Sequence, residues 1–180
     1  MQQLQMVTQR GENVAVYAIE GNFDNAQTEV KKIFTDPGVI ARLAERGTVL
    51  SSANSINWGR LVPQIVYYFS AYADLVGCEC IKLGDPVNFV VPTGNFGNIL
   101  AGYYAKRMGL PVGKLICASN QNDVLADFMK SGVYDANRNF YTTMSPSMDI
   151  LISSNLERLL YELCGKDDRQ VAAMMEELKE

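Results

Sequence analysis

The sequence predicts an α/β protein built on a mainly parallel sheet with helices on both faces. Strand-like and helix-like segments alternate along the 180 residues. Most apolar segments predicted as strands end at a turn and lead into apolar residues at helical spacing. This alternation is typical of βαβ units, whose buried parallel strands need covering helices. An apolar share of 48% and a charged share of 20% are typical of a globular protein.

The first part of the chain is expected to contain two strands and three helices. Residues 13–19 and 48–50 are apolar or β-branched, which favours strands. Helices are expected over about 24–35, over 39–45, and from about 58 to 76, where Pro63 should bend the helix slightly.

The second part continues the alternation. Residues 88–91 and 114–118 are predicted strands, and helices are expected over 99–108, 123–130, 156–163 and 170–180. Gly109 and Gly132 mark helix ends. We expect one domain over residues 1–165, followed by an acidic C-terminal helix over residues 166–180.

The turn after the strand 88–91 is the most informative segment, and it reads Pro92-Thr93-Gly94-Asn95-Phe96-Gly97-Asn98. The first N–H groups of a helix lack partners within it, and the helix dipole adds positive charge there, so phosphate is a common ligand. Glycine permits positive φ and close approach of a ligand. The same letters also fit a plain strand-to-helix turn that binds nothing.

Other phosphate and nucleic-acid motifs fit this turn less well. It lacks the Gly-Lys-Ser/Thr ending of a P-loop and the three-glycine pattern of dinucleotide folds. A Gly-x-x-Gly loop occurs in KH domains, but these need a basic face, whereas 20 acidic residues exceed 16 basic ones here. We therefore expect no nucleic-acid partner.

Two further polar loops follow predicted strands, over residues 51–57 and 119–123. The carboxyl ends of parallel strands meet at one edge of a sheet, so these loops and the glycine turn could line one small-molecule pocket. Arg60 could attract an anionic substrate, or it could be an ordinary surface arginine. For the Asn, Ser and Asp residues the alternative role is helix capping, which we favour for Asp123.

Composition excludes several chemistries. The chain has no histidine, so a Ser-His-Asp triad, a histidine-ligated zinc and an imidazole base are all impossible within it. Cysteines stand at positions 78, 80, 117 and 164, and we interpret them as reduced structural thiols rather than metal ligands. No apolar run reaches the length of a membrane span, and no signal peptide is evident, which favours the cytoplasm. Acid–base catalysis would fall to lysine, a carboxylate or a cofactor.

Six motifs occur in one order along residues 1–163: Ser52-Ala53-Asn54-Ser55-Ile56-Asn57-x-x-Arg60-Leu61, Tyr67-Tyr68-Phe69, Val91-Pro92-Thr93-Gly94-Asn95-Phe96-Gly97-Asn98, Leu110-Pro111-Val112, Ala118-Ser119-Asn120-x-Asn122-Asp123 and Ser145-Pro146-Ser147-Met148-Asp149-Ile150. In this series the chain resembles the threonine synthases. The resemblance implies a pyridoxal-phosphate (PLP) lyase of the tryptophan-synthase-β fold type (fold type II), which converts O-phosphohomoserine and water into threonine and phosphate in threonine biosynthesis.

The resemblance also implies roles for particular residues. By it, Gly94, Asn95, Phe96, Gly97 and Asn98 hold the cofactor phosphate, and Asn54, Ser55, Asn57 and Arg60 line or border the substrate site. The cofactor would supply the electron sink and its Schiff-base lysine the proton transfer, which fits a chain without histidine.

Threonine synthases are much longer than this chain. By the resemblance, an upstream half that carries the Schiff-base lysine and a substrate-carboxylate loop is missing. Lys106 is nine residues from Gly97 along a predicted helix, too far to replace that lysine. We therefore assign no catalytic residue, and we expect the isolated piece to be inactive and to self-associate through uncovered apolar surface. The alternative is a non-catalytic module that binds a phosphorylated metabolite or a partner.

Overall fold

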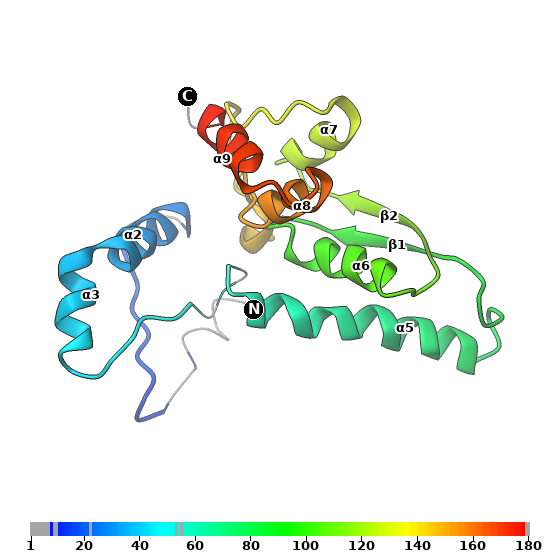
Figure 1. Cartoon of the computed structure of the whole chain (residues 1–180), viewed down its shortest axis with the longest axis horizontal. Helices are drawn as coiled ribbons and strands as arrows, with labels where there is room; N and C mark the ends of the chain where they lie inside the picture. The colour runs from blue at the N-terminus through cyan, green and yellow to red at the C-terminus, as the bar shows by residue number, and fades with distance from the viewer. Residues whose placement is uncertain (1–7, 9–10, 22, 53, 55, 179–180) are drawn as a thin grey trace. The chain divides into compact units, whose positions relative to one another are not determined.

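The computed structural model describes residues 8, 11–21, 23–52, 54 and 56–178 (Figure 1). The chain divides into two compact units, Met1–Leu50 and Ser51–Glu180. The candidate site and the sheet belong to the second unit. The boundary predicted at residues 165 and 166 stays a prediction.

The first unit contains two helices in succession, α2 (Phe23–Thr35) and α3 (Pro37–Ala44). The Asp36 carboxylate caps α3 by accepting a hydrogen bond from the Val39 N–H at 2.9 Å, and Pro37 occupies the first turn, where its missing N–H costs nothing. Both helices are therefore confirmed, and the Asp-Pro-Gly sequence both ends one and begins the next.

The strands predicted at residues 13–19 and 48–50 are wrong. Both segments are irregular and mostly exposed, apart from an isolated antiparallel bridge between Gly11 and Val14. β-branched residues favour a strand only where a neighbouring strand and a packed face are present. No described residue supplies such a neighbour here.

The long helix predicted after residue 57 forms in three pieces. These are α4 (Trp58–Leu61), a 3₁₀ turn η1 (Val62–Gln64) and α5 (Ile65–Gly77). Pro63 lies in the 3₁₀ turn, because proline cannot donate the hydrogen bond that a continuous α-helix would require there. Along α5, Tyr68 and Tyr72 are buried.

The sheet consists of β1 (Val87–Pro92) and β2 (Val112–Ala118), which pair in parallel. The helix α6 (Gly97–Arg107) connects them, so the predicted βαβ unit and the α/β class are confirmed. Figure 1 shows α6 between the sheet and α5. Phe89, Val91, Leu115 and Cys117 point to this covered face, whereas Val90 and Ile116 on the opposite face are 64% and 43% exposed.

The core lies where α6 meets the sheet and α5. Leu100, Ala101 and Ala105 of α6 have no exposed surface. A Cβ at Gly102 would stand 2.7 Å from the Tyr68 ring and 2.9 Å from Leu115 Cδ2, which is closer than real Cβ contacts. Glycine at this position therefore allows α6 to lie close to both α5 and β2.

The remaining elements are α7 (Val124–Ser131), a 3₁₀ turn η2 (Pro146–Met148), α8 (Leu156–Leu163) and α9 (Asp168–Glu177). The helices α8 and α9 pack together. Gly132 ends α7 with φ of 76°, as expected of a glycine after a helix. None of the described helices is long and apolar enough to cross a membrane.

Candidate functional site

The loop Thr93–Asn98 connects the carboxyl end of β1 to the first turn of α6. The Thr93 N–H donates to the Ala118 carbonyl at 2.8 Å, which fixes the start of the loop beside the end of β2. The loop and residues 119–122 therefore leave the sheet at the same edge, as predicted. In α/β proteins this edge is where ligands bind.

The conformation of this loop differs from expectation in one respect. Neither Gly94 nor Gly97 has positive φ; the left-handed residue is Phe96, with φ of 65° and only 3% of its surface exposed. A bulky residue in this region is unusual and marks a locally constrained backbone. Gly94 instead permits close approach, because a Cβ there would lie 3.3 Å from Ile150 and 3.4 Å from the Met148 Cα.

Five successive main-chain N–H groups in this loop have no acceptor within the part of the chain that the structure describes. From Gly94 to Asn98, none donates a hydrogen bond to any acceptor among the described residues. These residues are buried or half-buried, and main-chain N–H groups in such surroundings are nearly always paired. The loop therefore offers a row of unused donors at a helix N-terminus, where an anion is favoured.

Carbonyl groups of the same loop, in contrast, are held by neighbouring side chains. The Tyr68 hydroxyl donates to the Asn98 carbonyl at 2.7 Å, and burial raises the pKa of Tyr68 to about 12, so this donor keeps its proton at neutral pH. The Ser153 hydroxyl donates to the Gly94 carbonyl, and the Asn98 side chain donates to the Pro92 carbonyl. With its carbonyls bound on the protein side, the loop keeps its N–H groups available.

Asn155 and Arg158 connect the loop to the segment that precedes α4. Asn155 has no exposed surface, and its side-chain amide donates to the Asn95 carbonyl at 3.0 Å. The Arg158 guanidinium donates to Asn155 Oδ1 and to the Ile56 carbonyl, each at 2.6 Å, and lies 5.7 Å from the Trp58 ring centre. Residues 56–58, 95 and 155–158 therefore form one hydrogen-bonded assembly.

Neither Asn155 nor Arg158 was predicted from the sequence to be a site residue. The leucines of segment 156–163 predicted an amphipathic helix and gave no role to Arg158. The sequence signal was the polar run Ser153-Ser154-Asn155 before the helix, and in the structure the side chain of Asn155, at the N-cap position, does not cap that helix. Polar residues at that position that do not cap the helix are available for other partners.

Of the residues predicted to line a substrate site, Asn54 and Asn57 bind their own loop. Asn54 Oδ1 accepts from the Ser52 hydroxyl at 2.8 Å and from the Ile56 N–H at 2.9 Å. Asn57 Oδ1 caps α4 by accepting a hydrogen bond from the Gly59 N–H, and Asn57 Nδ2 donates to the Ser52 carbonyl. Arg60 is exposed and its guanidinium contacts no acceptor among the described residues, while Ser55 lies outside them. Their roles toward a substrate stay predictions.

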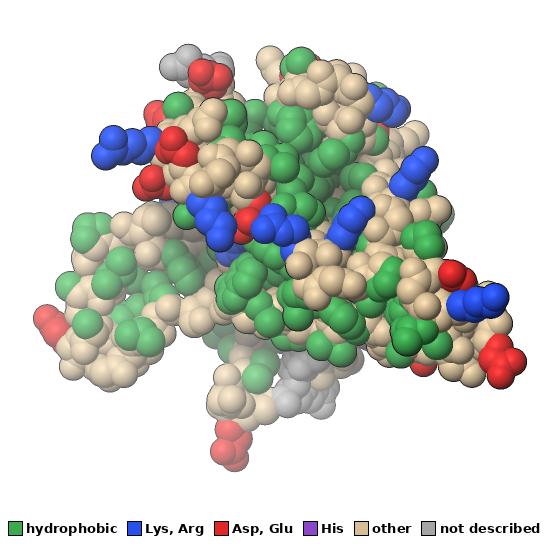
Figure 2. Space-filling view, turned by 45° about the vertical axis from the view of Figure 1, so that its right-hand side comes forward, with side chains coloured by type: hydrophobic (Ala, Val, Ile, Leu, Met, Phe, Trp, Pro, Cys, Tyr) green, Lys and Arg blue, Asp and Glu red, His purple; other side chains and the backbone are tan. Residues whose placement is uncertain are grey.

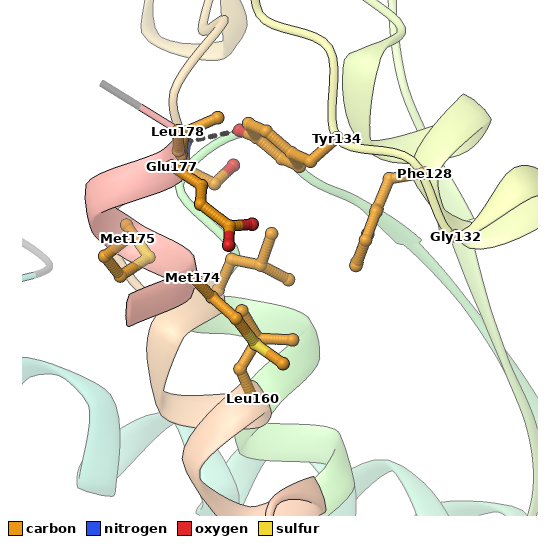
Figure 3. A pocket seen from close by; sticks show the side chains of 10 residues that line it. Phe128, Gly132, Tyr134, Leu160, Met174, Met175, Glu177 and Leu178 are labelled. Carbon is orange, nitrogen blue, oxygen red and sulfur yellow. Dashed lines mark hydrogen bonds between the residues drawn. The ribbon is translucent and has the colours of Figure 1, made fainter. Parts of the chain in front are cut away.

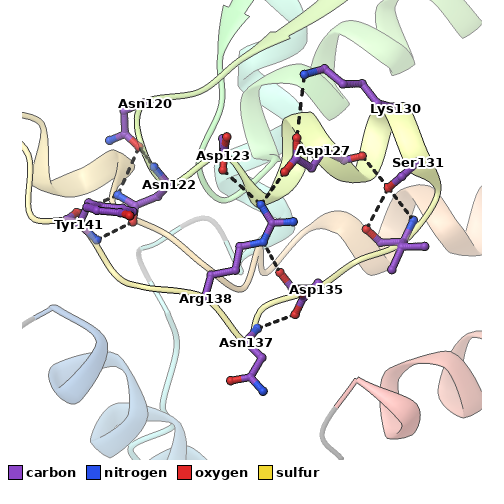
Figure 4. Close-up of polar contacts among 11 residues, drawn as sticks. Asn120, Asn122, Asp123, Asp127, Lys130, Ser131, Asp135, Asn137, Arg138 and Tyr141 are labelled. Carbon is purple, nitrogen blue, oxygen red and sulfur yellow. Dashed lines mark hydrogen bonds and ion pairs between the residues drawn. The ribbon is translucent and has the colours of Figure 1, made fainter.

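The polar loop after β2 is built around a buried carboxylate. Asp149, 3% exposed, accepts hydrogen bonds from Asn120 Nδ2 at 2.7 Å, from the Thr143 hydroxyl at 2.7 Å and from the Thr143 N–H at 2.8 Å. Asn122 donates to it as well. The Asn122 side chain also pairs with the main chain of Tyr141 (Figure 4). Burial opposes ionisation, but these donors outweigh it, so the pKa of Asp149 is lowered.

Asp123, favoured as a helix cap, has a different partner. It stands directly before α7, but its carboxylate does not bind the helix N-terminus. It lies 3.2 Å from the Arg138 guanidinium, which also contacts Asp127 at 2.6 Å (Figure 4). The hydrogen bond from Arg138 lowers the pKa of Asp127. This loop is therefore stabilised by its own contacts, and its predicted contribution to a pocket is not tested.

A cavity of about 430 Å³ lies between α7, α8 and α9 (Figure 3). Its lining is largely apolar and includes Phe128, Leu156, Leu160 and Met174, with the Glu177 carboxylate as its charged group. An apolar lining with a carboxylate disfavours phosphate. The candidate anion site is therefore the loop Thr93–Asn98 and not this cavity.

Lys106, the lysine nearest to the loop in sequence, lies away from it. Lys106 lies in the last turn of α6 and donates to the Gly113 carbonyl at 2.9 Å, at the opposite end of the helix from Gly97. The expectation that Lys106 is not the Schiff-base residue is consistent with this position. In the described part of the chain, no three acidic or cysteine side chains form a group that could hold a metal ion.

The sequence of this chain is similar to that of known proteins. No family model matches the chain. Human threonine synthase-like 1 is 52% identical over 180 residues, which covers 99% of this chain and 24% of that protein. The threonine synthase of Pseudomonas aeruginosa is 47% identical and is matched over 36% of its length. This chain is a homologue of one segment of threonine synthase.

The structural comparison supports the same relationship. The crystal structure of PLP-bound threonine synthase from Brucella melitensis superposes with a TM-score of 0.81 at 48% identity, over 99% of this chain and 36% of that one. The chain thus spans about a quarter to a third of the threonine synthases and threonine synthase-like proteins compared here.

Proposed function

We propose that this chain is the cofactor-phosphate segment of a PLP-dependent threonine synthase, which forms threonine and phosphate from O-phosphohomoserine and water. The observation that carries the proposal is the row of free N–H groups from Gly94 to Asn98 at the start of α6. The likeness to a PLP-bound threonine synthase supports the identity of the ligand. The runner-up, a non-catalytic phosphometabolite-binding module, has no observation of its own in its favour.

The loop is chemically suited to a phosphate dianion. Its free donors are neutral main-chain N–H groups, and the positive end of the α6 dipole adds to their attraction. Asn95 and Asn98 add side-chain amides without adding negative charge. PLP, when bound, supplies the electron sink for the chemistry on the substrate. The residues of this chain bind its phosphate and thereby orient the ring.

The reaction requires more than this segment. We propose that the Schiff-base lysine lies outside these 180 residues, that the chain alone does not turn over substrate, and that the complete enzyme is cytoplasmic. The much greater length of the homologues supports the first two points. Asn54, Ser55, Asn57 and Arg60 are proposed to border the substrate, since Arg158 connects their segment to the phosphate loop through Asn155.

Replacing Asn95 by aspartate tests the phosphate loop. Asn95 Oδ1 accepts from the Ser154 hydroxyl at 3.2 Å, and a carboxylate keeps that contact while adding a negative charge beside the free N–H groups. We expect Asn95→Asp to weaken the binding of pyridoxamine 5′-phosphate about tenfold or more through charge repulsion. Calorimetric titration measures this, and pyridoxamine without phosphate should bind equally to both proteins. Neither ligand has an aldehyde, so surface lysines cannot capture it.

Asn88→Asp is the matched control. Asn88 lies in β1, the strand that precedes the loop, and its Oδ1 accepts from the Lys114 N–H at 2.7 Å, but it is exposed and stands at the end of the strand away from the loop. This variant should bind pyridoxamine 5′-phosphate as the unchanged chain does. Equal affinities of all three proteins for the phosphorylated ligand would contradict the assignment of the loop.

We also propose that the isolated chain self-associates. Hydrophobic side chains occur on its surface (Figure 2), and Val90 and Ile116 are exposed side by side on the open face of the sheet. Apolar surface left in water favours association. We expect Val90→Lys with Ile116→Lys to lower the weight-average mass seen by sedimentation equilibrium. A chain that is already monomeric at high concentration would contradict this proposal.

A further inference from the structure

Two cysteines follow the last residue of α5, and their side chains are in direct contact. The sulfur atoms of Cys78 and Cys80 lie 2.7 Å apart, and both residues are exposed. Cys117 and Cys164, the other free cysteines, are partly buried. All four cysteines were predicted from the sequence to be structural thiols, but an exposed pair contributes no core packing.

The helix end holds the two thiols together. The Glu79 N–H donates to the Val76 carbonyl and the Cys80 N–H donates to the Leu75 carbonyl, each at 3.0 Å. This is the hydrogen-bond pattern of a Schellman motif, with Glu79 in its left-handed position at φ of 60°. The backbone of residues 78–80 is therefore fixed before any bond forms between the sulfurs, which removes much of the entropic cost of bringing them together.

From this geometry we propose that Cys78 and Cys80 form a thiol–disulfide exchange site, which reacts with low-molecular-weight disulfides and closes to a disulfide within the turn. The contact also divides the roles of the two thiols. Hydrogen bonding to Cys80 lowers the pKa of Cys78, against smaller opposing effects of desolvation and of the Asp74 charge, and the same contact raises the pKa of Cys80. Cys78 is thus the attacking thiolate.

The reaction balances with the disulfide reagent as oxidant. The Cys78 thiolate attacks one sulfur of the reagent, so that the reagent S–S bond breaks, a mixed disulfide forms and one thiolate leaves. Cys80 then loses its proton and attacks the Cys78 sulfur, which releases the second thiolate. Two electrons pass from the cysteine pair to the reagent, and the two leaving thiolates take up the two protons.

Glutathione redox buffers test the proposal on the full chain. After equilibration and alkylation, the peptide with residues 78–80 is weighed by mass spectrometry. We expect the mass of this peptide to show the loss of two hydrogen atoms. The equilibrium constant for forming the Cys78–Cys80 disulfide should be about tenfold larger in the folded chain than in concentrated urea, because the turn is formed only in the folded chain. The reaction of the Cys80→Ser variant should stop at the mixed disulfide between Cys78 and glutathione, whereas the Cys164→Ser variant should react as the unchanged chain does.

A second pair of variants tests the turn itself. Proline cannot adopt the positive φ of residue 79, so Glu79→Pro should reduce closure to the value in urea, while Glu79→Gly, which adopts that φ readily, should keep it. The proposal is wrong if the thiols stay separate in every buffer. It is equally wrong if folded and urea-treated chains close to the same extent.

Discussion

Asp149→Ala is expected to lower the free energy of unfolding of the second unit by about 4 kcal/mol, the range of a lost buried hydrogen-bond network. The substitution removes the acceptor shared by Asn120, Asn122 and Thr143, and the partly buried N–H and hydroxyl of Thr143 lose the acceptor that they share. Trp58 is the single tryptophan of the chain and lies in the same unit, so its fluorescence in a urea titration reports the change.

The same carboxylate predicts a pH dependence. The pKa of Asp149 is lower in the folded chain than in the unfolded one, so the folded state binds fewer protons. Its stabilisation is complete above the ordinary pKa of an aspartate and is lost as the pH falls through the folded value. The difference in stability between the unchanged chain and Asp149→Ala should therefore shrink from pH 7 toward pH 3.

Asp135→Asn serves as the control for Asp149. Asp135 is exposed, and its carboxylate accepts one hydrogen bond, from the Asn137 N–H at 2.9 Å. We expect a change of less than about 0.5 kcal/mol, typical of surface positions. If Asp149→Ala were as mild, or its effect were constant over pH, the ionised network would not stabilise the loop.

Local signals in the sequence predicted those elements that depend on local chemistry. Pro63 and Gly132 mark helix irregularities and ends because their effects arise within a few residues. The strand prediction for residues 13–19 was wrong for the opposite reason, since a strand there would depend on a partner strand elsewhere in the chain. Helical and turn elements are thus more predictable here than isolated strands.

The candidate site was predictable to a similar extent. The glycine turn and its place at the sheet edge followed from strand, turn and helix signals. The left-handed conformation of Phe96 did not, because it depends on packing around the loop. The contacts of Asn155 and Arg158 span about 60 and 100 residues of sequence, and no local pattern encodes such pairing.

Arg158→Met should weaken the binding of pyridoxamine 5′-phosphate about tenfold or more, by releasing the phosphate loop from the segment before α4. Methionine keeps the length of the side chain but cannot donate to Asn155 and to the Ile56 carbonyl. Two charge-assisted hydrogen bonds are then lost, and Asn155 loses the group that orients its amide toward Asn95. We expect Arg158 to act as a positioning residue, since its own contacts are with the protein.

Arg107→Met is the matched control for Arg158. Arg107 is exposed, donates to the Tyr103 hydroxyl at 3.0 Å and lies 5.9 Å from the centre of that ring, so it makes similar contacts away from the loop. A general loss of stability would weaken the binding of pyridoxamine and of pyridoxamine 5′-phosphate alike. A change in the position of the loop should weaken the binding of the phosphorylated ligand alone. Arg158→Lys should restore part of this selectivity. If Arg158→Met bound both ligands as Arg107→Met does, Arg158 would serve the fold alone.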